Sequence, residues 1–359
     1  MRVKLEDVCE RGSSNLKQSD VEDNTGNYPI YGAAGCLGNV NFYHQDKPYV
    51  AVVKDGAGIG RTTLHPAKSS VIGTMQYLIP KENILPEYLY YVVKHMHLEK
   101  YFTGATIPHI YYKDYKKEEL NLVDLKLQAE VVRILKKVEG MIVVRKQELE
   151  KLDTLIKSRF TEMFGDPVSN SYDLPEATLS DLGEFGRGVS KHRPRNDIKL
   201  LGGKYPLIQT GDIANAGLYI TSYSNTYSEL GLRQSKMWDK GTLCITIAAN
   251  IAKTAILEFD ACFPDSVVGF IANERTNNIF IHYWFSFFQA ILESQAPESA
   301  QKNINLKILS ELKVIVPEKR KQDEFASFVK LIDKLKATIQ KSIDEAQTLF
   351  DSLMQEYFG

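Results

Sequence analysis

The glycine-rich segment of residues 56–63 is the first candidate for chemistry in this sequence, because glycines that precede a basic residue can cradle a phosphate group. Its spacing does not fit a phosphate-binding loop. The interval between Gly56 and Gly60 is one residue short, and Arg61 stands where that loop has lysine. A dinucleotide-binding loop is also excluded, because the third glycine comes too early. We therefore interpret the segment as a tight turn, in which glycine lets the backbone bend sharply or lie close to a ligand.

The sequence contains no recognisable catalytic or metal-binding motif. None of its seven histidines lies in an HExxH motif, and the spacing of His95 and His97 points them to different sides of a helix. There is no GxSxG elbow, and no Asn-Pro-Pro or Asp-Pro-Pro motif of the kind that amino-methyltransferases use at their target base. Asp-Pro at residues 166–167 and Pro-Asp at residues 264–265 lack the acidic-x-lysine partner of a metal nuclease. We expect a binding chain with no catalytic residue, cofactor or metal of its own.

The composition is that of a globular chain of 359 residues, a length typical of two or three domains. Hydrophobic residues make up 43% and charged residues 25%, which excludes a disordered or collagen-like chain. The formal net charge of −1 argues against a nucleic-acid binder, since such domains are usually basic. No secretory signal is visible, and no apolar run approaches the roughly 18 residues of a membrane helix. The four cysteines include no CxxC pair and are typical of buried free thiols in a reducing cytosol, so we expect a cytoplasmic protein.

An internal repeat organises the chain. Residues 128–165 align without a gap with residues 322–359, at an offset of 194, and both segments end in Phe-Gly. Apolar residues recur in each segment at alternating intervals of four and three, which is typical of a coiled-coil seam. The predicted seam consists of Val131, Leu135, Val138, Ile142, Leu149, Leu152, Ile156, Phe325, Val329, Ile332, Ile339, Ile343, Phe350 and Leu353. Two such seams favour pairing of the helices with each other; the alternative is two unrelated amphipathic helices, each packed on its own domain.

The regions before the two helices also correspond, in the same order. Residues 28–30 resemble residues 205–207 at an offset of 177, residues 58–62 resemble residues 250–254 at 192, and residues 70–73 resemble residues 266–269 at 196. The predicted layout is a globular region at 1–127, a helix at 128–165, a second globular region at 166–321 and a second helix at 322–359. Within the globular regions, β-branched runs such as residues 49–53 predict buried strands, and residues 279–293 predict a buried helix, so the fold class is α+β.

These features together resemble the specificity subunit of type I restriction–modification enzymes, over essentially the full length of the chain. Residues 205–213 (Tyr-Pro-Leu-Ile-Gln-Thr-Gly-Asp-Ile) are similar to the family's early recognition-domain motif, and residues 28–35 (Tyr-Pro-Ile-Tyr-Gly-Ala-Ala-Gly) to its other common variant. Residues 160–167 (Phe-Thr-Glu-Met-Phe-Gly-Asp-Pro) are similar to its transition from the first helix to the second domain. Residues 122–127 depart from the family, because they lack the proline-rich strand end that Val316-Pro317 partly keeps.

The resemblance implies two pseudo-symmetric globular target recognition domains, joined by two long α-helices that form an antiparallel coiled coil. Each domain would read one half of a bipartite target in double-stranded DNA. The helices would dock two methyltransferase subunits, which would bind S-adenosylmethionine. Where restriction subunits are present, two of them would join the complex and use ATP and Mg²⁺. The alternative interpretation is an interaction scaffold, with two binding modules on a coiled-coil stalk and no role in DNA binding.

Sequence readout of DNA needs amide, hydroxyl and basic side chains at base edges, together with contacts to phosphates. We expect two loops of each domain to converge on the DNA. The candidates are Lys54, Arg61, Thr62, Thr106, His109, Tyr111 and Lys113 in the first domain, and Gln209, Thr210, Asn250, Lys253, Gln301, Lys302, Asn303 and Asn305 in the second. The densest basic loop, residues 186–195, adds Arg187, Lys191, Arg193 and Arg195 as candidate phosphate contacts; the alternative is a solvated loop. Because each half of the chain is close to neutral, we expect weak DNA affinity for the isolated chain.

Overall fold

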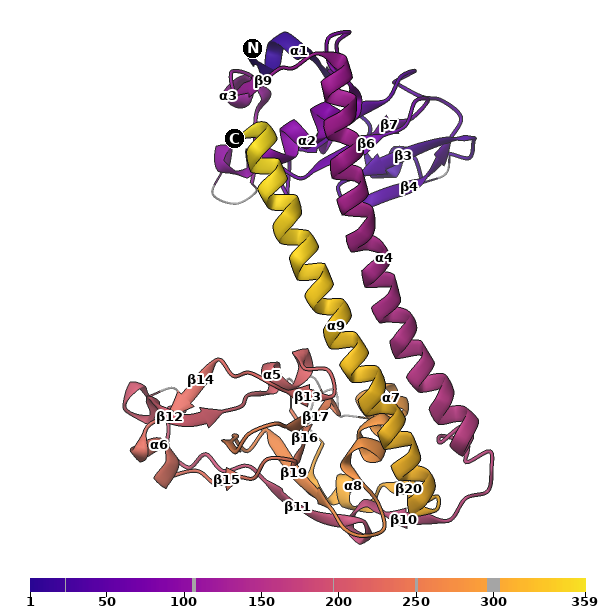
Figure 1. Ribbon diagram of the computed structural model, residues 1–359, viewed down its shortest axis with the longest axis vertical. Coiled ribbons are helices and arrows are strands. Elements are labelled where there is room, and N and C mark those ends of the chain that lie inside the picture. The colour runs from indigo at the N-terminus through magenta and orange to yellow at the C-terminus, as the bar shows by residue number, and fades with distance from the viewer. Residues whose placement is uncertain (23, 105–107, 196, 249–250, 296–303) are drawn as a thin grey trace. The chain divides into compact units, whose positions relative to one another are not determined.

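The computed structural model describes residues 1–22, 24–104, 108–195, 197–248, 251–295 and 304–359, and these form two compact units (Figure 1). Unit 1 comprises Met1–Lys146 and Gln340–Gly359, and unit 2 comprises Gln147–Ile339. Two long helices, α4 (Leu125–Phe164) and α9 (Lys319–Phe358), contribute to both units. Each unit therefore combines one globular region with one part of each long helix.

Unit 1 is built on two sheets and a covering helix. Its globular elements are β1 (Arg2–Lys4), α1 (Leu5–Val8), β2 (Cys9–Ser13), η1 (Gln18–Asp20), β3 (Tyr28–Gly32), β4 (Gly35–Val40), β5 (Tyr49–Val53), β6 (Thr62–His65), β7 (Ser70–Val71), β8 (Met75–Pro80), α2 (Pro86–His95), η2 (Leu98–Tyr101), α3 (Tyr112–Tyr115) and β9 (Glu119–Asn121). One sheet has the order β2–β8–β5–β6 and is antiparallel throughout, and the other has the order β4–β3–β7, with β3 and β7 parallel. Strands β1 and β9 form a separate antiparallel pair.

Unit 2 repeats this plan with additions. Its globular elements are β10 (Glu176–Thr178), η3 (Leu179–Asp181), β11 (Gly183–Arg187), η4 (Ile198–Leu200), β12 (Leu201–Leu207), α5 (Thr210–Asn215), β13 (Tyr219–Ile220), β14 (Asn225–Tyr227), α6 (Glu229–Arg233), β15 (Met237–Trp238), β16 (Leu243–Thr246), β17 (Thr254–Leu257), β18 (Ala261–Cys262), β19 (Val267–Ala272), α7 (Asn278–Gln295), α8 (Leu306–Glu311) and β20 (Lys313–Ile315). Its sheets have the orders β11–β19–β16–β17–β13 and β14–β12–β18–β15, and β10 pairs with β20.

The strand orders show that the two units are copies of one fold. The order β2–β8–β5–β6 recurs as β11–β19–β16–β17, with β13 added at one edge. The order β4–β3–β7 recurs as β14–β12–β18, with β15 added, and the parallel pair of β3 and β7 recurs as β12 and β18. The register repeats as well, because Val52 is paired with Thr62 in the first copy and Ile245 with Thr254 in the second. The duplication therefore includes the globular regions as well as the helices.

The strand pairing corrects one detail of the predicted repeat. Ile30 on β3 is paired with Ser70 on β7, and Leu207 on β12 is paired with Cys262 on β18. The counterpart of Ser70 is therefore Cys262, at an offset of 192, and not Ser266, at an offset of 196. The prediction is wrong here because a Ser-Val pair occurs by coincidence at Ser266, just before β19, which is the counterpart of β8.

The two long helices begin three residues before the predicted starts and end one residue before the predicted ends. The earlier start of α4 has a local cause, since the Asp124 carboxylate accepts a hydrogen bond from the N–H of Leu127 at 2.9 Å and satisfies a free donor of the first turn. At the other end, Gly165 has a φ of 76° and donates its N–H to the carbonyl of Thr161 at 2.8 Å. Glycine at this position ends the helix without steric cost.

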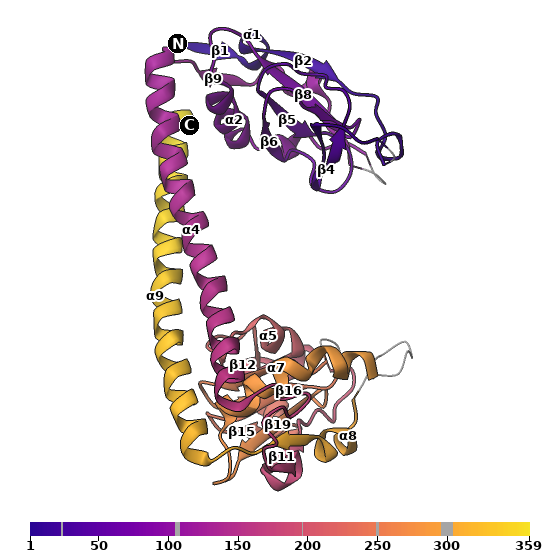
Figure 2. The ribbon, with the colours of Figure 1, turned by 90° about the vertical axis from the view of Figure 1, so that its right-hand side faces the viewer.

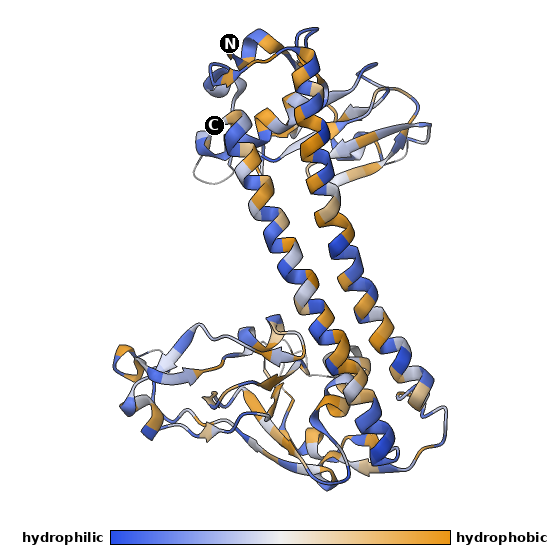
Figure 3. Cartoon of the chain, in the orientation of Figure 1, coloured by the Kyte–Doolittle hydropathy of each residue, from blue (hydrophilic) through white to orange (hydrophobic). Residues whose placement is uncertain are grey.

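The helices α4 and α9 run antiparallel (Figures 1 and 2), and in unit 2 apolar residues of both helices, such as Ile156 and Val329, belong to one core cluster. Figure 3 shows apolar residues recurring along both helices between polar ones. All fourteen predicted seam residues are buried or half-buried: Val131, Leu135, Val138, Ile142, Ile343, Phe350 and Leu353 in unit 1, and Leu149, Leu152, Ile156, Phe325, Val329, Ile332 and Ile339 in unit 2. The heptad pattern missed Phe160, which is fully buried and lies 5.3 Å from Phe325 between ring centroids.

The most apolar run of the sequence forms α7, the helix that covers the larger sheet of unit 2. Phe280, Ile281, Trp284 and Phe285 on this helix are fully buried, as expected for a core helix. None of the helices in the described part of the chain is long and apolar enough to cross a membrane.

The cysteines follow the prediction with one exception. Cys9, Cys244 and Cys262 are buried free thiols, whereas Cys36 is exposed. The prediction of a buried thiol is wrong for Cys36 because β4 is the edge strand of a three-stranded sheet, so one side of the strand has no neighbour to cover it.

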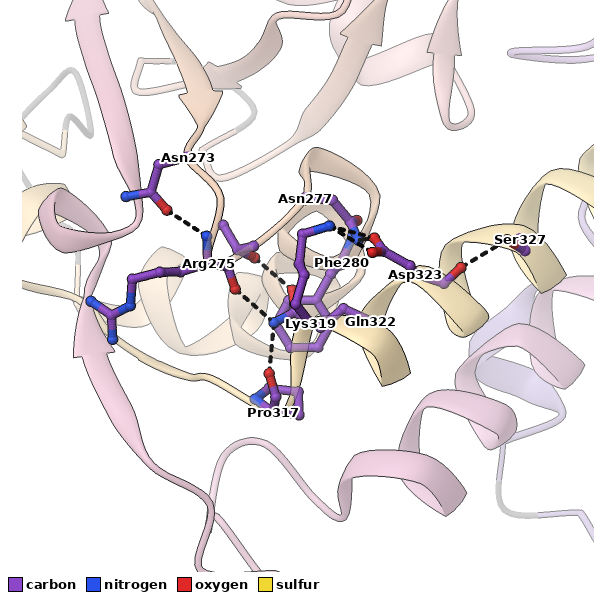
Figure 4. A network of polar contacts seen from close by, with 10 residues as sticks. Asn273, Arg275, Asn277, Phe280, Pro317, Lys319, Gln322, Asp323 and Ser327 are labelled. Atoms are coloured by element: carbon purple, nitrogen blue, oxygen red, sulfur yellow. Dashed lines mark hydrogen bonds and ion pairs between the residues drawn. The ribbon is translucent and has the colours of Figure 1, made fainter.

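A fully buried glutamine attaches the start of α9 to unit 2 (Figure 4). The side-chain amide of Gln322 donates to the carbonyls of Arg275 at 3.0 Å and Pro317 at 2.8 Å. Its carbonyl oxygen accepts the hydroxyl of Thr276 at 2.8 Å. Every polar atom of this buried amide end therefore has a partner, and the loop before α7 is joined to the first turns of α9.

Gln128, the residue that aligns with Gln322 at the offset of 194, has the same role in unit 1. Its amide donates to the carbonyls of Asn83 at 3.0 Å and Val123 at 2.8 Å, and its carbonyl accepts the N–H of Leu85 at 2.8 Å. It is also fully buried. The duplication therefore preserves a specific hydrogen-bonding arrangement and not only an apolar pattern.

Candidate nucleic-acid interface

The glycine-rich segment of unit 1 is the turn between β5 and β6, which confirms the interpretation from the sequence. Gly56, Gly58 and Gly60 have φ values of 84°, 88° and 80°, a region that glycine adopts far more readily than other residues. A Cβ added to Gly60 would lie 2.5 Å from the backbone nitrogen of Glu99. The turn is therefore held close to the segment that follows α2.

This turn meets a second candidate loop, as expected. The N–H of Ile110 donates to the carbonyl of Lys54 at 2.9 Å, and Asp55 forms an isolated β-bridge with His109. The structure thus brings Lys54 beside His109, although they are far apart in the sequence. Thr106 lies outside the described residues.

A carboxylate that the sequence reasoning missed lies between these two candidates. One oxygen of Asp55 is 2.7 Å from Nδ1 of His109, and the other is 3.8 Å from Nζ of Lys54. Beside them, the Tyr111 ring is half exposed and lies between the His109 ring, at 6.3 Å, and Nζ of Lys113, at 5.2 Å from its centroid. An accessible aromatic ring among cations is the combination that stacks on a base while phosphates are neutralised.

Two other candidates of unit 1 are turned toward the protein's own backbone. Arg61 donates from Nη1 to the carbonyl of Ala33 at 3.0 Å, and the hydroxyl of Thr62 donates to the carbonyl of Gly60 at 3.2 Å. Arg61 keeps further N–H donors and Thr62 keeps acceptor capacity, so each could add a contact to DNA without losing this hydrogen bond. Their first role in this structure is to fix the turn.

In unit 2 the basic loop of residues 186–195 is built closely against the segment of residues 263–267. Gly188 donates its N–H to the carbonyl of Val267 at 2.8 Å, and a Cβ added there would lie 2.3 Å from two backbone carbonyl oxygens of that segment. Only glycine permits this approach. The loop is therefore positioned by backbone packing at its start.

The four cations of this loop differ in their partners. Arg193 and Arg195 both form ion pairs with Asp265, and Arg193 also donates to the carbonyls of Ser190 at 2.7 Å and His192 at 2.8 Å. Arg187 and Lys191 are exposed, and among the described residues no ion pair involves either of them. The loop is therefore less positive than its sequence indicates.

A pocket of about 320 Å³ opens beside the basic loop and joins it to two further candidates. It is lined by Ser190, Arg195, Leu201, Leu207, Gln209, Thr210, Asn225, Tyr227, Pro264 and Ser266. Gln209 and Thr210 thus share a pocket with Arg195, a grouping that the sequence reasoning did not foresee. Asn225 is an additional amide in the same pocket that it missed. Amide and hydroxyl groups beside an apolar wall are the chemistry with which proteins read base edges.

The remaining candidates of unit 2 lie near the end of β16. The N–H of Lys253 donates to the hydroxyl of Thr246 at 3.0 Å, and the N–H of Ile304 donates to the carbonyl of Ile247 at 2.9 Å. Asn305 is the N-cap of α8, where its side chain accepts the N–H of Ile308 at 2.9 Å, so this oxygen already has a structural role. Asn250, Gln301, Lys302 and Asn303 lie outside the described residues.

Two histidines have structural environments of the kind expected from the sequence. His65 is 2.7 Å from the Thr63 hydroxyl, and Nδ1 of His282 is 2.9 Å from the Thr254 hydroxyl. Burial lowers the pKa of each imidazole to about 4, so both are neutral at neutral pH. Within the described ranges, no three histidine, cysteine or acidic side chains gather as metal ligands would.

A duplicated α+β unit, a pair of antiparallel helices and loops that carry amides and cations define a class of recognition protein with two binding units. The chain belongs to the family of the type I restriction modification DNA specificity domain, whose model matches residues 1–154 and 173–347. Specificity subunits of this family are in general non-catalytic.

The comparisons with known proteins agree with this assignment. A curated relative, the "Putative type I restriction enzyme MjaX specificity subunit" of Methanocaldococcus jannaschii, is 21% identical over 294 residues, which cover 77% of this chain and 69% of the relative. The crystal structure of a type I restriction–modification S subunit from M. genitalium has a TM-score of 0.66 at 15% identity and covers 100% of this chain and 96% of that chain. A structure described as the basis of complex assembly and conformational transition of the type I system has a TM-score of 0.59 at 13% identity, covering 99% and 97%. The two structures support the fold.

Proposed function

We propose that this chain is the specificity subunit of a type I restriction–modification complex, in which each unit reads one half of a bipartite DNA target. The observation that carries this proposal is the duplication itself: two units with the same strand order and register each present a cluster of polar and cationic loop residues. Two copies of one reader suit a target with two parts. The methyltransferase subunits, with S-adenosylmethionine, and any restriction subunits, with ATP and Mg²⁺, would supply the chemistry.

The direct test is to express the full chain with its cognate methyltransferase subunit and to map methylated adenines across the host genome. We expect one motif made of two short specific sequences separated by an unspecified spacer, present only when the chain is expressed. In the same experiment, Gln209→Ala should relax the specificity for one half of the motif and leave the other half unchanged. The lost bidentate contact should reduce the discrimination against wrong bases by about 1–3 kcal/mol.

The possible outcomes separate the proposal from its alternatives. Methylation that does not depend on the chain, or a single continuous motif, would contradict a bipartite reader. Methyl transfer by the purified chain with S-adenosylmethionine alone would instead identify it as an enzyme. An interaction scaffold without a DNA role predicts capture of partners but no change in the methylation pattern.

We further propose that the helix pair docks one methyltransferase subunit in each unit. Unit 1 exposes Met141 on α4 and Leu349 on α9, with exposed fractions of 49% and 50%. Unit 2 exposes their repeat counterparts, Leu335 on α9 and Leu155 on α4, with 46% and 45%. The recurrence of large apolar side chains at matching exposed positions in both copies supports the proposal of one docking surface in each unit.

The double substitution Leu155→Asp and Leu335→Asp should reduce the number of bound methyltransferase subunits from two to one, because charge at an apolar contact removes its favourable burial. Native mass spectrometry of the purified complex measures this stoichiometry. Met141→Asp with Leu349→Asp should have the same effect in unit 1. The duplicated exposed threonines Thr154 and Thr348 provide matched controls, because each is turned by about 100° around the helix from Leu155 or Leu349. Their change to aspartate should leave two subunits bound. A complex with two subunits in both apolar variants would exclude this surface.

A further inference from the structure

Two arginines of unit 2 converge on one carboxylate at the surface of the candidate interface. Nη2 of Arg193 lies 3.5 Å from Oδ2 of Asp265, and Nη2 of Arg195 makes a shorter contact with Oδ1. The side chains are 55%, 48% and 31% exposed for Arg193, Arg195 and Asp265 respectively. A molecule from solution can therefore reach the point where the three groups meet.

Arg193 is held in place by groups other than Asp265. Arg193 donates from Nη1 to two carbonyls of its own loop, those of Ser190 and His192, which orients its other nitrogen outward. The loop itself is fixed by the close contact of Gly188 with the segment that carries Asp265. The guanidinium group of Arg193 is therefore held by its own loop, and together with Arg195 it forms an anion site that the carboxylate occupies.

A second observation at this place points to a ligand. Arg195 lines the pocket of about 320 Å³, and so does Ser190, which is 6% exposed. The Ser190 hydroxyl is buried and has no hydrogen-bond partner among the described residues. A buried polar atom without a partner is costly unless something outside the chain satisfies it.

We propose that Arg193 and Arg195 form the binding site for one DNA phosphate, and that the Asp265 carboxylate occupies this site until DNA displaces it. The inference rests on the proposed function, in which unit 2 binds DNA. Guanidinium groups bind carboxylate and phosphate through the same charge-assisted hydrogen bonds, so one anion can replace the other without rearrangement of the loop. Asp265 thereby lowers the affinity for DNA in general, because a phosphate must compete with a tethered anion.

Unit 1 shows the same arrangement with other residues. Asp55 lies between Lys54 and His109, at 3.8 Å and 2.7 Å. The two acidic residues are not repeat counterparts, because Asp55 follows β5 whereas Asp265 follows β18. Each unit therefore has a carboxylate beside its candidate DNA-contacting side chains.

The test uses the full chain in its complex with the methyltransferase subunit and a fluorescent DNA duplex that lacks the target sequence. We expect Asp265→Asn to tighten binding about fivefold and to make the slope of log K against log salt more negative by about 0.9, one additional neutralised phosphate, over roughly 50–200 mM salt. The double variant Arg193→Ala and Arg195→Ala should change both quantities in the opposite direction.

Glu274→Gln is the matched control, because it removes one exposed negative charge beyond the opposite end of β19 in the same unit. Equal effects of Glu274→Gln and Asp265→Asn would show a general change in charge and overturn the proposal. Weaker binding by Asp265→Asn would also overturn it, since Asp265 would then orient the arginines for DNA. If the Asp265→Asn variant unfolds, Asp265→Ser replaces it in the same binding measurement. Tryptophan fluorescence checks that each variant is folded. Wild-type methylation of a bipartite target tests the proposed function separately.

Discussion

Phe160→Ala should lower the free energy of unfolding of unit 2 by about 3–5 kcal/mol, the general range for large aromatic residues truncated in a core. Phe160 is fully buried on α4 and packs against two other helices, α7 and α9. Its ring centroid is 5.0 Å from that of Phe164, 5.4 Å from that of Phe280 on α7 and 5.3 Å from that of Phe325 on α9. Because rigid elements surround the ring on several sides, the space left by alanine cannot collapse, and the cost should be near the upper end of that range.

The chain offers a specific measurement for this prediction. Its only two tryptophans, Trp238 and Trp284, both belong to unit 2, so urea unfolding followed by tryptophan fluorescence reports on that unit. Leu331→Ala is a suitable control, since Leu331 lies on α9 in the same unit and is 65% exposed; it should change the free energy of unfolding by less than about 0.5 kcal/mol. Similar values for the two variants would mean that the aromatic cluster does not hold α4 to unit 2.

Gln322→Leu should destabilise unit 2 by on the order of 3 kcal/mol. Leucine nearly matches glutamine in size, so packing changes little, but the carbonyls of Arg275 and Pro317 and the hydroxyl of Thr276 lose their partner. Buried polar groups left without a hydrogen bond pay their full desolvation cost. The same fluorescence-monitored urea titration measures the change.

Gln147→Leu is the matched control for this substitution, because Gln147 is exposed on α4 within unit 2. Its effect should stay within about 0.5 kcal/mol. The equivalent change Gln128→Leu falls in unit 1, which has no tryptophan, and should be detected by circular dichroism instead. If Gln322→Leu leaves the stability of unit 2 unchanged, the buried amide is replaceable by apolar packing and does not attach α9.

The long helices and the duplication are the features that sequence reasoning recovers best. A seam such as Val131, Leu135 and Val138 is visible in the sequence because helix geometry places residues three and four apart on one side. The ends of the helices are less predictable, since the start of α4 depends on the Asp124 cap, which the apolar periodicity does not include. Phe160 escaped the heptad pattern because its partners include Phe280 on α7, and a two-helix pattern does not include contacts with a third helix.

The candidate interface was harder to assemble from the sequence. The loops that carry Lys54 and His109 were expected from the sequence to converge, and the structure places these two residues together. The grouping of Gln209 with Arg195 and Asn225 in one pocket could not be predicted from the sequence, because it depends on how β12 and β14 meet the basic loop. The carboxylate partners Asp55 and Asp265 also escaped notice, although they determine the charge that the cations present to solvent.

The amino-acid sequence alone was sufficient to predict the duplication, the two helices, the α+β class and the family resemblance. These features depend on periodicity and on residues that are close in the chain. The folded arrangement was needed to show that Asp265 neutralises Arg193 and Arg195, and that Ser190 presents an unpartnered hydroxyl beside them. Ion pairs and pockets depend on distances between residues some seventy positions apart, and no local pattern specifies those distances. The near-neutral net charge is a property of the composition, but which cations are neutralised depends on the fold.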